Sequence, residues 1–223
     1  MIAKSVLRVT VAVLATMTGL YPAFYYLRSG NPGLLQQKSA ELLASHFYQG
    51  SFYTHITFGG MALLIGWMQF SKKIRARNPD LHRGLGKAYM VAVGLSAVAG
   101  YIIAMSATGG AVSMAGFGLL AIVWLYTDLR GYVSIRRLDI GRHRAWMLRN
   151  YSLTFAAVTL RIYLPLATAV LHFDFISSYR VISWLCWVPN LIVAEILVRR
   201  ALKNPEGASA VASAPFPGRY KAS

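Results

Sequence analysis

The chain has 223 residues, of which 56% are hydrophobic and 13% charged, and 23 Lys and Arg against 7 Asp and Glu give a formal net charge of +16. The charged share is about half of the roughly 25% typical of soluble domains, which excludes an ordinary soluble domain, and the apolar content excludes a disordered chain. The single cysteine excludes a disulfide scaffold. High apolar content with basic loops favours a membrane protein over a nucleic-acid-binding protein.

Six segments are long and apolar enough to cross a bilayer, because a membrane-spanning helix needs about 20 mostly apolar residues. They predict an all-α fold, a six-helix transmembrane bundle that forms one membrane domain over residues 1–203. The apolar run of the first segment is longer than that of a secretory signal, so we expect this segment to be retained. In chain order the segments are 6–27, 51–70, 87–106, 112–132, 146–171 and 179–198.

The connections and the tail have patterns of their own. Residues 34–48 predict a short amphipathic helix that lies on the membrane in the first outer loop. Residues 107–111 contain Gly109 and Gly110 and predict a tight hairpin turn between the third and fourth segments. Residues 204–223 are rich in Ala, Ser and Pro without an apolar period, and they predict a disordered cytoplasmic tail.

The distribution of basic residues predicts the orientation of the bundle. Nineteen of the 23 Lys and Arg lie at the two termini or in the loops that follow the second and fourth segments. Three lie on the opposite side, Arg28, Lys38 and Arg180, and Arg161 lies within a span. Because cytoplasmic loops carry an excess of Lys and Arg, both termini of this multi-pass membrane protein are predicted to be cytoplasmic.

The fifth segment carries almost all of its polar residues on one helical face. Arg161 lies near the middle of this segment, and a charge at that depth faces the bundle interior rather than lipid. It is either a brace between helices, with Asn190 of the sixth segment as its acceptor, or a cavity residue that binds a carboxylate or a heme propionate. Pro165 predicts a kink. The face consists of His143, Met147, Asn150, Thr154, Ala157, Arg161, Pro165, Thr168 and His172.

The histidines form two candidate pairs at different depths. His82 and His143 lie at the cytoplasmic starts of the third and fifth segments, whereas His55 and His172 lie toward the outer side. Paired imidazoles between helices can hold the iron of heme b, and the plan is similar to that of cytochrome b561-like proteins, in which four histidines lie within the central helices. The alternative is that these histidines contact headgroups, cap helices or pack between them.

Two acidic residues lie near the cytoplasmic ends of their spans. Asp128 and Glu195 predict ion pairs with loop arginines such as Arg130, Arg144 or Arg149, with proton transfer as the alternative. The chain has no phosphate-binding loop, dinucleotide fingerprint, His-Glu-x-x-His motif or Cys-x-x-Cys motif. ATP-driven transport, zinc proteolysis and thiol redox chemistry are therefore disfavoured.

Three strings carry a resemblance to a known family. Residues 142–154 read Arg-His-Arg-Ala-Trp-Met-Leu-Arg-Asn-Tyr-Ser-Leu-Thr, residues 82–89 read His-Arg-Gly-Leu-Gly-Lys-Ala-Tyr, and residues 187–195 read Trp-Val-Pro-Asn-Leu-Ile-Val-Ala-Glu. Over about residues 53–199 the chain resembles the bacterial domain-of-unknown-function family 2306 of predicted membrane proteins. The resemblance implies a multi-span inner-membrane protein with no established activity. It also implies that the family pattern includes His55, His82, His143, Arg149, Arg161, Asn190 and Glu195.

These observations leave three hypotheses for function. The first is a heme-b protein for transmembrane electron transfer, a component of a membrane oxidoreductase with a redox partner. His55 with His172 and His82 with His143 would then bind iron, and Arg161 or Arg149 would bind a propionate. The second is a permease without a cofactor, whose Arg161 and Asn190 bind a small anion and whose His55 is linked to protons. The third is a structural or assembly factor, in which the stripe of polar residues only joins helices. Asn150, Tyr151, Asn190 and Glu195 complete the candidate site, and no nucleic-acid partner is expected.

Overall fold

The computed structural model describes residues 2–27 and 33–203, and all regular structure in these ranges is helical, as predicted. The predicted tail, 204–223, lies outside the described residues. The first half of the chain forms α1 (Ile2–Leu20), α2 (Pro22–Leu27), the 3-10 turn η1 (Gly33–Gln37), α3 (Ala40–Ala44), α4 (His46–Gln69), α5 (Lys72–Arg77) and α6 (Pro79–Ala104). The second half forms α7 (Ala111–Arg136), α8 (Ile140–Thr154), α9 (Ala156–Pro165), the π-helical turn η2 (Leu166–Val170), α10 (Phe175–Leu185) and α11 (Val188–Lys203).

Five helical segments of the described chain are long and apolar enough to cross a membrane, namely Val6–Leu27, Pro79–Ala104, Ala111–Arg136, Ile140–Val170 and Phe175–Lys203. The chain is therefore a multi-pass membrane protein. The remaining predicted span, 51–70, lies in α4, which has 24 residues but is not among the five. Polar side chains such as Gln49 and His55 interrupt the apolar sequence of this helix.

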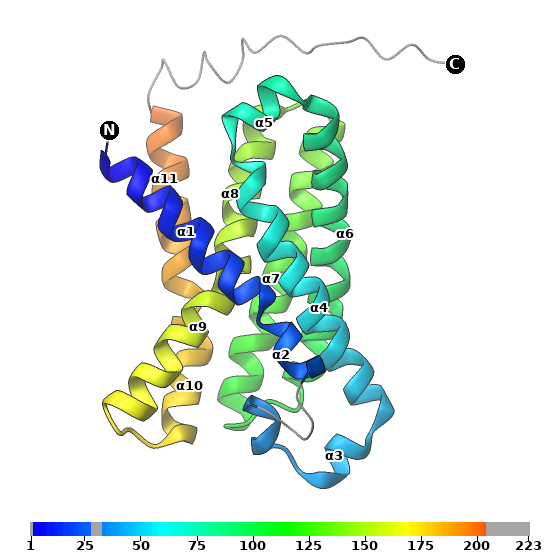
Figure 1. Ribbon diagram of the computed structural model, residues 1–223, viewed down its shortest axis with the longest axis vertical. Coiled ribbons are helices and arrows are strands. Elements are labelled where there is room, and N and C mark those ends of the chain that lie inside the picture. Colours follow the sequence, from blue (N-terminus) through cyan, green and yellow to red (C-terminus); the bar gives the residue numbers. More distant parts are fainter. Residues whose placement is uncertain (1, 28–32, 204–223) are drawn as a thin grey trace.

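The long helices form an upright bundle, and α1 and the pair α9 and α10 are inclined to it (Figure 1). In this bundle α4 packs against α6, α6 against α7, and α7 against α8. Helix α1 crosses α4 obliquely, while α9 and α10 lean away at the lower left of Figure 1. Helix α1 begins and α11 ends at the end of the bundle that carries α5 (Figure 1). We call this end, which holds most of the Lys and Arg, the basic end.

The segment before α4 is not the single amphipathic helix predicted over 34–48. It contains η1 and α3 instead, and residues 46–48 already belong to α4. The reason is local capping, since the Ser39 side chain accepts a hydrogen bond from Leu42 N and the Ser45 side chain accepts one from Tyr48 N. Each serine begins a new helix and ends the preceding segment.

The hairpin between α6 and α7 is present as predicted. Gly109 and Gly110 have φ values of 98° and 72°, in the region that favours glycine. The Arg180 side chain supports the turn from α10, because its Nε lies 2.8 Å from the carbonyl oxygen of Gly109 and donates to it. The turn therefore positions α7 antiparallel to α6.

Two of the predicted spans are broken near their middles. Helix α8 ends at Thr154 and α9 begins at Ala156, and α10 ends at Leu185 before α11 begins at Val188. The Asn190 amide stabilises both breaks, since its Nδ2 lies 3.0 Å from Cys186 O and 3.3 Å from Ser152 O. A second irregularity follows Pro165, where the helix widens into η2 because proline has no N–H to donate.

Candidate functional site

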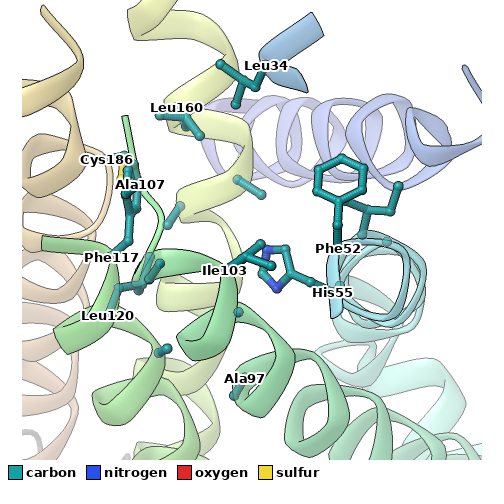
Figure 2. A pocket seen from close by; sticks show the side chains of 18 of the residues that line it. Leu34, Phe52, His55, Ala97, Ile103, Ala107, Phe117, Leu120, Leu160 and Cys186 are labelled. Carbon is teal, nitrogen blue, oxygen red and sulfur yellow. The ribbon is translucent and has the colours of Figure 1, made fainter. Parts of the chain in front are cut away.

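A cavity of about 210 Å³ lies within the bundle and is lined by residues of α1, α2, α4, α6, α7, α8, α9, α10 and η1 (Figure 2). Its walls are mostly apolar, with Phe52, Ile103, Phe117, Leu120 and Leu160 among the lining residues. On the side away from the basic end, Leu34 and Leu35 of η1 cover it. The cavity is the place in the described bundle where several of the predicted polar residues meet.

Arg161 reaches this cavity from α9, so the prediction that it faces inward is confirmed. Its Nη1 donates to Ala157 O at 3.0 Å, and its Cζ lies 4.7 Å from the centre of the Tyr21 ring. Its Nε is buried without a hydrogen-bond partner. Among the described residues no carboxylate forms an ion pair with it. The guanidinium therefore keeps a free donor and an uncompensated charge.

Lys38 is a second cation at the same cavity. It lies beyond η1 at the covering side, and its amine donates to the carbonyl oxygen of Ser106. Burial lowers the pKa of the Lys38 amine, because a charged group is less stable away from water. No Asp or Glu is among the described residues that line the cavity. The cavity is thus apolar in its walls and cationic in its ionisable groups.

His55 points from α4 into the cavity beside Ile103 (Figure 2). Its Nδ1 lies 2.9 Å from the carbonyl oxygen of Ser96 on α6, which can only accept, so Nδ1 carries the proton of the neutral ring. The Ser96 hydroxyl donates to the backbone oxygen of His55 at 2.9 Å and fixes the two helices together. The Nε2 lone pair of the neutral ring therefore remains available.

Three tyrosines complete the polar lining. Tyr25, Tyr48 and Tyr179 are buried and line the cavity from α2, α4 and α10. Their hydroxyls are close enough to interact electrostatically. These tyrosines, Lys38 and Ser96 could not be identified as site residues from the sequence, because they are ordinary residues of span ends, loops and helices. Only their spatial convergence distinguishes them.

A buried hydrogen-bond network forms the side of the cavity toward the basic end. Thr154 and Trp124 line the cavity, and the Trp124 indole N–H donates to Thr154 Oγ1 at 2.9 Å. Behind them, the Tyr89 hydroxyl donates to Asn150 Oδ1 at 2.6 Å. The Asn150 amide donates to Trp124 O and to Thr127 Oγ1, each at 2.9 Å. Asn150, a predicted site residue, therefore joins α6, α7 and α8.

Three other candidate residues have structural partners outside the cavity. Arg149 donates from Nε and Nη2 to Glu195 Oε2 at 2.8 and 2.6 Å, and Arg199 pairs with the other oxygen of Glu195 at 2.9 Å. The predicted pairing of Glu195 is thus confirmed. The Tyr151 hydroxyl donates to Leu63 O at 3.4 Å. None of these side chains is among those that line the cavity.

The predicted ion pair of Asp128 is wrong. The carboxyl is buried, with 4% of the residue exposed, and Oδ1 has no hydrogen-bond partner within the described chain. No arginine forms an ion pair with it in the described chain, and two of the three proposed have other contacts: Arg130 and Arg149 stack on Trp146, and Arg149 also binds Glu195. Asp128 interacts electrostatically with Tyr89.

Asn190 and His172 lie apart from the cavity. The Asn190 amide donates to Thr159 Oγ1 at 3.0 Å as well as to the two helix breaks. Thr159 and Arg161 are two positions apart on α9 and thus on different helical faces, so Asn190 is not combined with Arg161 in one anion site. His172 is exposed after η2, with a φ of 56°, and does not line the cavity with His55.

The inner pair of histidines does come together. His82 on α6 and His143 on α8 lie at the basic end, close enough to interact electrostatically. His143 Nδ1 lies 2.9 Å from Gly131 O, and His82 Nδ1 is buried without a partner. Over residues 2–27 and 33–203, no cluster of three or more His, Cys, Asp and Glu could hold a metal ion.

The fold and the cavity define a multi-pass helical membrane protein with a buried cationic site. The model of the family described as predicted membrane protein (DUF2306) matches residues 52–198, well over half of the chain, so the protein belongs to this family. No curated protein and no solved structure matches the chain. The function is therefore inferred from the residues of the site.

Proposed function

We propose that this protein binds a small amphipathic anion, a carboxylate on an aromatic ring or a short chain, in the central cavity and carries it across the inner membrane. The observation that carries the proposal is Arg161, a guanidinium at the cavity with a free buried Nε and no acidic partner in the described chain. A buried charge is strongly unfavourable unless it is paired, so the site is incomplete without an anion.

The charge of the ligand follows from the ionisable lining. Arg161 and Lys38 are cations and no lining residue of the described chain is acidic. A carboxylate that reaches Arg161 Nε satisfies the free donor and offsets the charge. The hydroxyl of Tyr48 supplies a further donor at the same cavity.

The size and polarity of the ligand follow from the walls. A cavity of about 150 Å³ with apolar walls holds benzene. The present cavity of about 210 Å³ therefore supports one ring or a short chain together with a carboxylate. Phe52, Phe117 and Leu160 offer apolar surface to the body of the ligand, while Arg161 offers a partner to its head.

We expect His55 to link binding to protons. Histidine changes its charge between pH 5 and 8, and the His55 Nε2 lone pair is available at the cavity. A bound anion favours the protonated ring, so binding takes up a proton. The groups that face His55 are the carbonyl and hydroxyl of Ser96 on α6 and the charge of Arg161 on α9.

We also infer that α4 is a sixth crossing and that both termini are cytoplasmic. Helix α4 extends between the two ends of the bundle, and α1 begins at the end where α11 finishes, which an even number of crossings requires (Figure 1). The excess of Lys and Arg at that end supports a cytoplasmic position. The cavity, covered by η1 on the opposite side, would then exchange its ligand with the outer face.

Heme b is the other occupant to consider. The cavity contains one of the four predicted histidine ligands, His55, and its volume is suited to one small ring. His82 and His143 are paired at the basic end, outside the cavity. These observations support a small anion more than a heme as the ligand of Arg161.

The first experiment compares three ligands that share a phenyl ring and differ in the polar group attached to it: benzoate, benzyl alcohol and benzylamine. Thermal unfolding is recorded in mild detergent, where a ligand specific for the folded state raises Tm. We expect benzoate alone to raise Tm. In Arg161→Gln this effect is lost, and in Arg136→Gln, where an arginine outside the cavity also lies over a tyrosine ring, it persists. Equal stabilisation by all three ligands would contradict the proposal. A pyridine hemochrome assay on the same sample measures whether heme is bound.

The second experiment tests transport. Proteoliposomes are loaded with unlabelled benzenesulfonate, an anion at every working pH, and uptake of labelled benzenesulfonate is followed. A carrier gives counterflow, with transient accumulation in vesicles that contain the wild-type protein and none in vesicles that contain Arg161→Gln. Binding without counterflow would leave a binding protein and refute the carrier.

A further inference from the structure

A second group of polar side chains, without an acidic partner in the described chain, lies at the basic end, remote from the cavity. Arg75 is on α5 and His82 on α6, His143 and Arg144 lie near the start of α8, and Gln69 is the last residue of α4. Arg75 interacts electrostatically with Arg144, and His82 interacts with Arg75, Arg144 and His143. Arg75 Nη1 also donates to the backbone oxygen of Gln69 at 2.8 Å. We call these five residues the basic-end cluster.

No carboxylate of the described chain neutralises this cluster. The acidic residues nearest in sequence are used by other arginines: Asp80 pairs with Arg83 at 3.2 Å, and Asp139 pairs with Arg142 at 3.2 Å. Arg75 and Arg144 take part in no ion pair with the described residues. Burial lowers the pKa of the Arg75 guanidinium, and the nearby charge of Arg144 lowers it further. Two like charges are thus held together without compensation.

The cluster also contains buried polar atoms without partners. Gln69 Nε2 and His82 Nδ1 are both buried and make no hydrogen bond with described residues. His143 Nδ1 is oriented by Gly131 O, so the other ring nitrogen of His143 is free. Buried polar groups are normally satisfied, and unsatisfied ones point to an absent ligand or water.

We propose that the basic-end cluster binds a phosphate group, either the head of an anionic phospholipid or a free phosphate compound. Two guanidinium groups and a neutral amide are donors that phosphate oxygens accept from, the neutral His82 ring adds one N–H, and guanidinium binds phosphate in a bidentate manner. The surrounding positive charge excludes a metal cation as the ligand. The site lies where α4 ends and α6 and α8 begin, and basic pockets between helix ends bind acidic lipid heads.

This site is independent of the proposed carrier function. None of its five residues lines the central cavity. Arg161→Gln is therefore expected to leave phosphate binding unchanged, and the loss of phosphate binding is expected to leave benzoate binding unchanged. The two proposals can fail separately.

The test measures thermal unfolding of the whole protein in neutral detergent with three added probes: inorganic phosphate, dioleoyl phosphatidylglycerol and dioleoyl phosphatidylcholine. We expect phosphatidylglycerol or inorganic phosphate to raise Tm, and phosphatidylcholine to have less effect. A shift with the lipid alone assigns a lipid head, and a shift with inorganic phosphate assigns a soluble phosphate compound. The proposal is overturned if neither phosphatidylglycerol nor inorganic phosphate raises Tm, or if phosphatidylcholine raises Tm as much as phosphatidylglycerol does.

Variants then locate the effect. Arg75→Gln/Arg144→Gln should weaken binding at least about tenfold for each lost guanidinium, because a hydrogen bond to a charged group contributes about one such factor. Arg136→Gln/Arg137→Gln removes the same charge from the same end and should bind as the wild type does. Equal weakening in both variants would reduce the site to nonspecific charge and overturn the proposal.

A second variant guards against a failure of the first to fold. Gln69→Glu introduces a carboxylate next to Arg75 in place of the proposed phosphate. We expect this variant to unfold at a higher temperature than the wild type without added probe and to lose the further rise in Tm with the phosphate probe. A wild-type response to the probe in Gln69→Glu would contradict a phosphate site at this cluster.

Discussion

Asn150 is the residue whose loss should weaken the bundle most directly through hydrogen bonding. It is fully buried, and its side chain bonds to Tyr89 Oη, Trp124 O and Thr127 Oγ1 on two other helices. Hydrogen bonds between membrane helices contribute on average about 0.6 kcal/mol each and at most about 1.7 kcal/mol. Asn150→Leu, which keeps the volume and removes three bonds, should therefore lower the free energy of unfolding by about 2 kcal/mol.

Reversible unfolding in mixed micelles, titrated with a denaturing detergent, measures this free energy. Thr168→Val is the matched control, because the Thr168 hydroxyl bonds only to Leu164 O of its own chain segment, and it should change stability by less than about 0.5 kcal/mol. Tyr89→Phe completes a double-mutant cycle with Asn150→Leu. A loss below about 0.5 kcal/mol in Asn150→Leu, or a coupling of zero with Tyr89, would refute the reasoning.

Two further predictions concern packing and capping. Gly66→Ala should destabilise the protein by about 1 to 3 kcal/mol, because the added Cβ would lie 2.3 Å from the Tyr151 ring. Gly84→Ala, where nothing lies within 4 Å, should be neutral or stabilising, and fluorescence-detected size exclusion after heating compares the two. The hydrogen bond from Ser177 N to the Asp174 carboxylate lowers the pKa of Asp174 in the folded protein. This stabilisation is present above the pKa that Asp174 has in the unfolded chain, and it is lost as the pH falls through the lower pKa that Asp174 has in the folded protein. Asp174→Asn should therefore flatten the decline of Tm below about pH 4. The same decline of Tm with falling pH in Asp174→Asn and in the wild type would contradict this prediction.

The spans were predictable because a bilayer imposes a length and a composition that can be counted in the sequence. The breaks within them were not. Phe155 interrupts the fifth segment without a proline or glycine at that position, and the carbonyl groups freed there find a donor in Asn190, which is 35 residues further along the chain. The effect of Pro165 was predictable, because it depends on one missing N–H.

The site was predictable only in part. Arg161 and His55 were identified because a charge and an imidazole within a span require a reason to be there. Lys38 and Ser96 were not, because a loop lysine and a helical serine are common and only the fold brings them to the cavity. Asn190 was assigned to Arg161 by depth alone, whereas the rotation of α9 directs Thr159 to Asn190 instead.

The most direct test of the account is the affinity of the protein for benzoate, measured by isothermal titration calorimetry in the wild type, Arg161→Gln and Arg136→Gln. The account predicts saturable binding to one site in the wild type and in Arg136→Gln. It predicts binding at least about tenfold weaker in Arg161→Gln, since a hydrogen bond to a charged group contributes about that factor. Equal affinity in the three proteins would contradict a ligand held by Arg161.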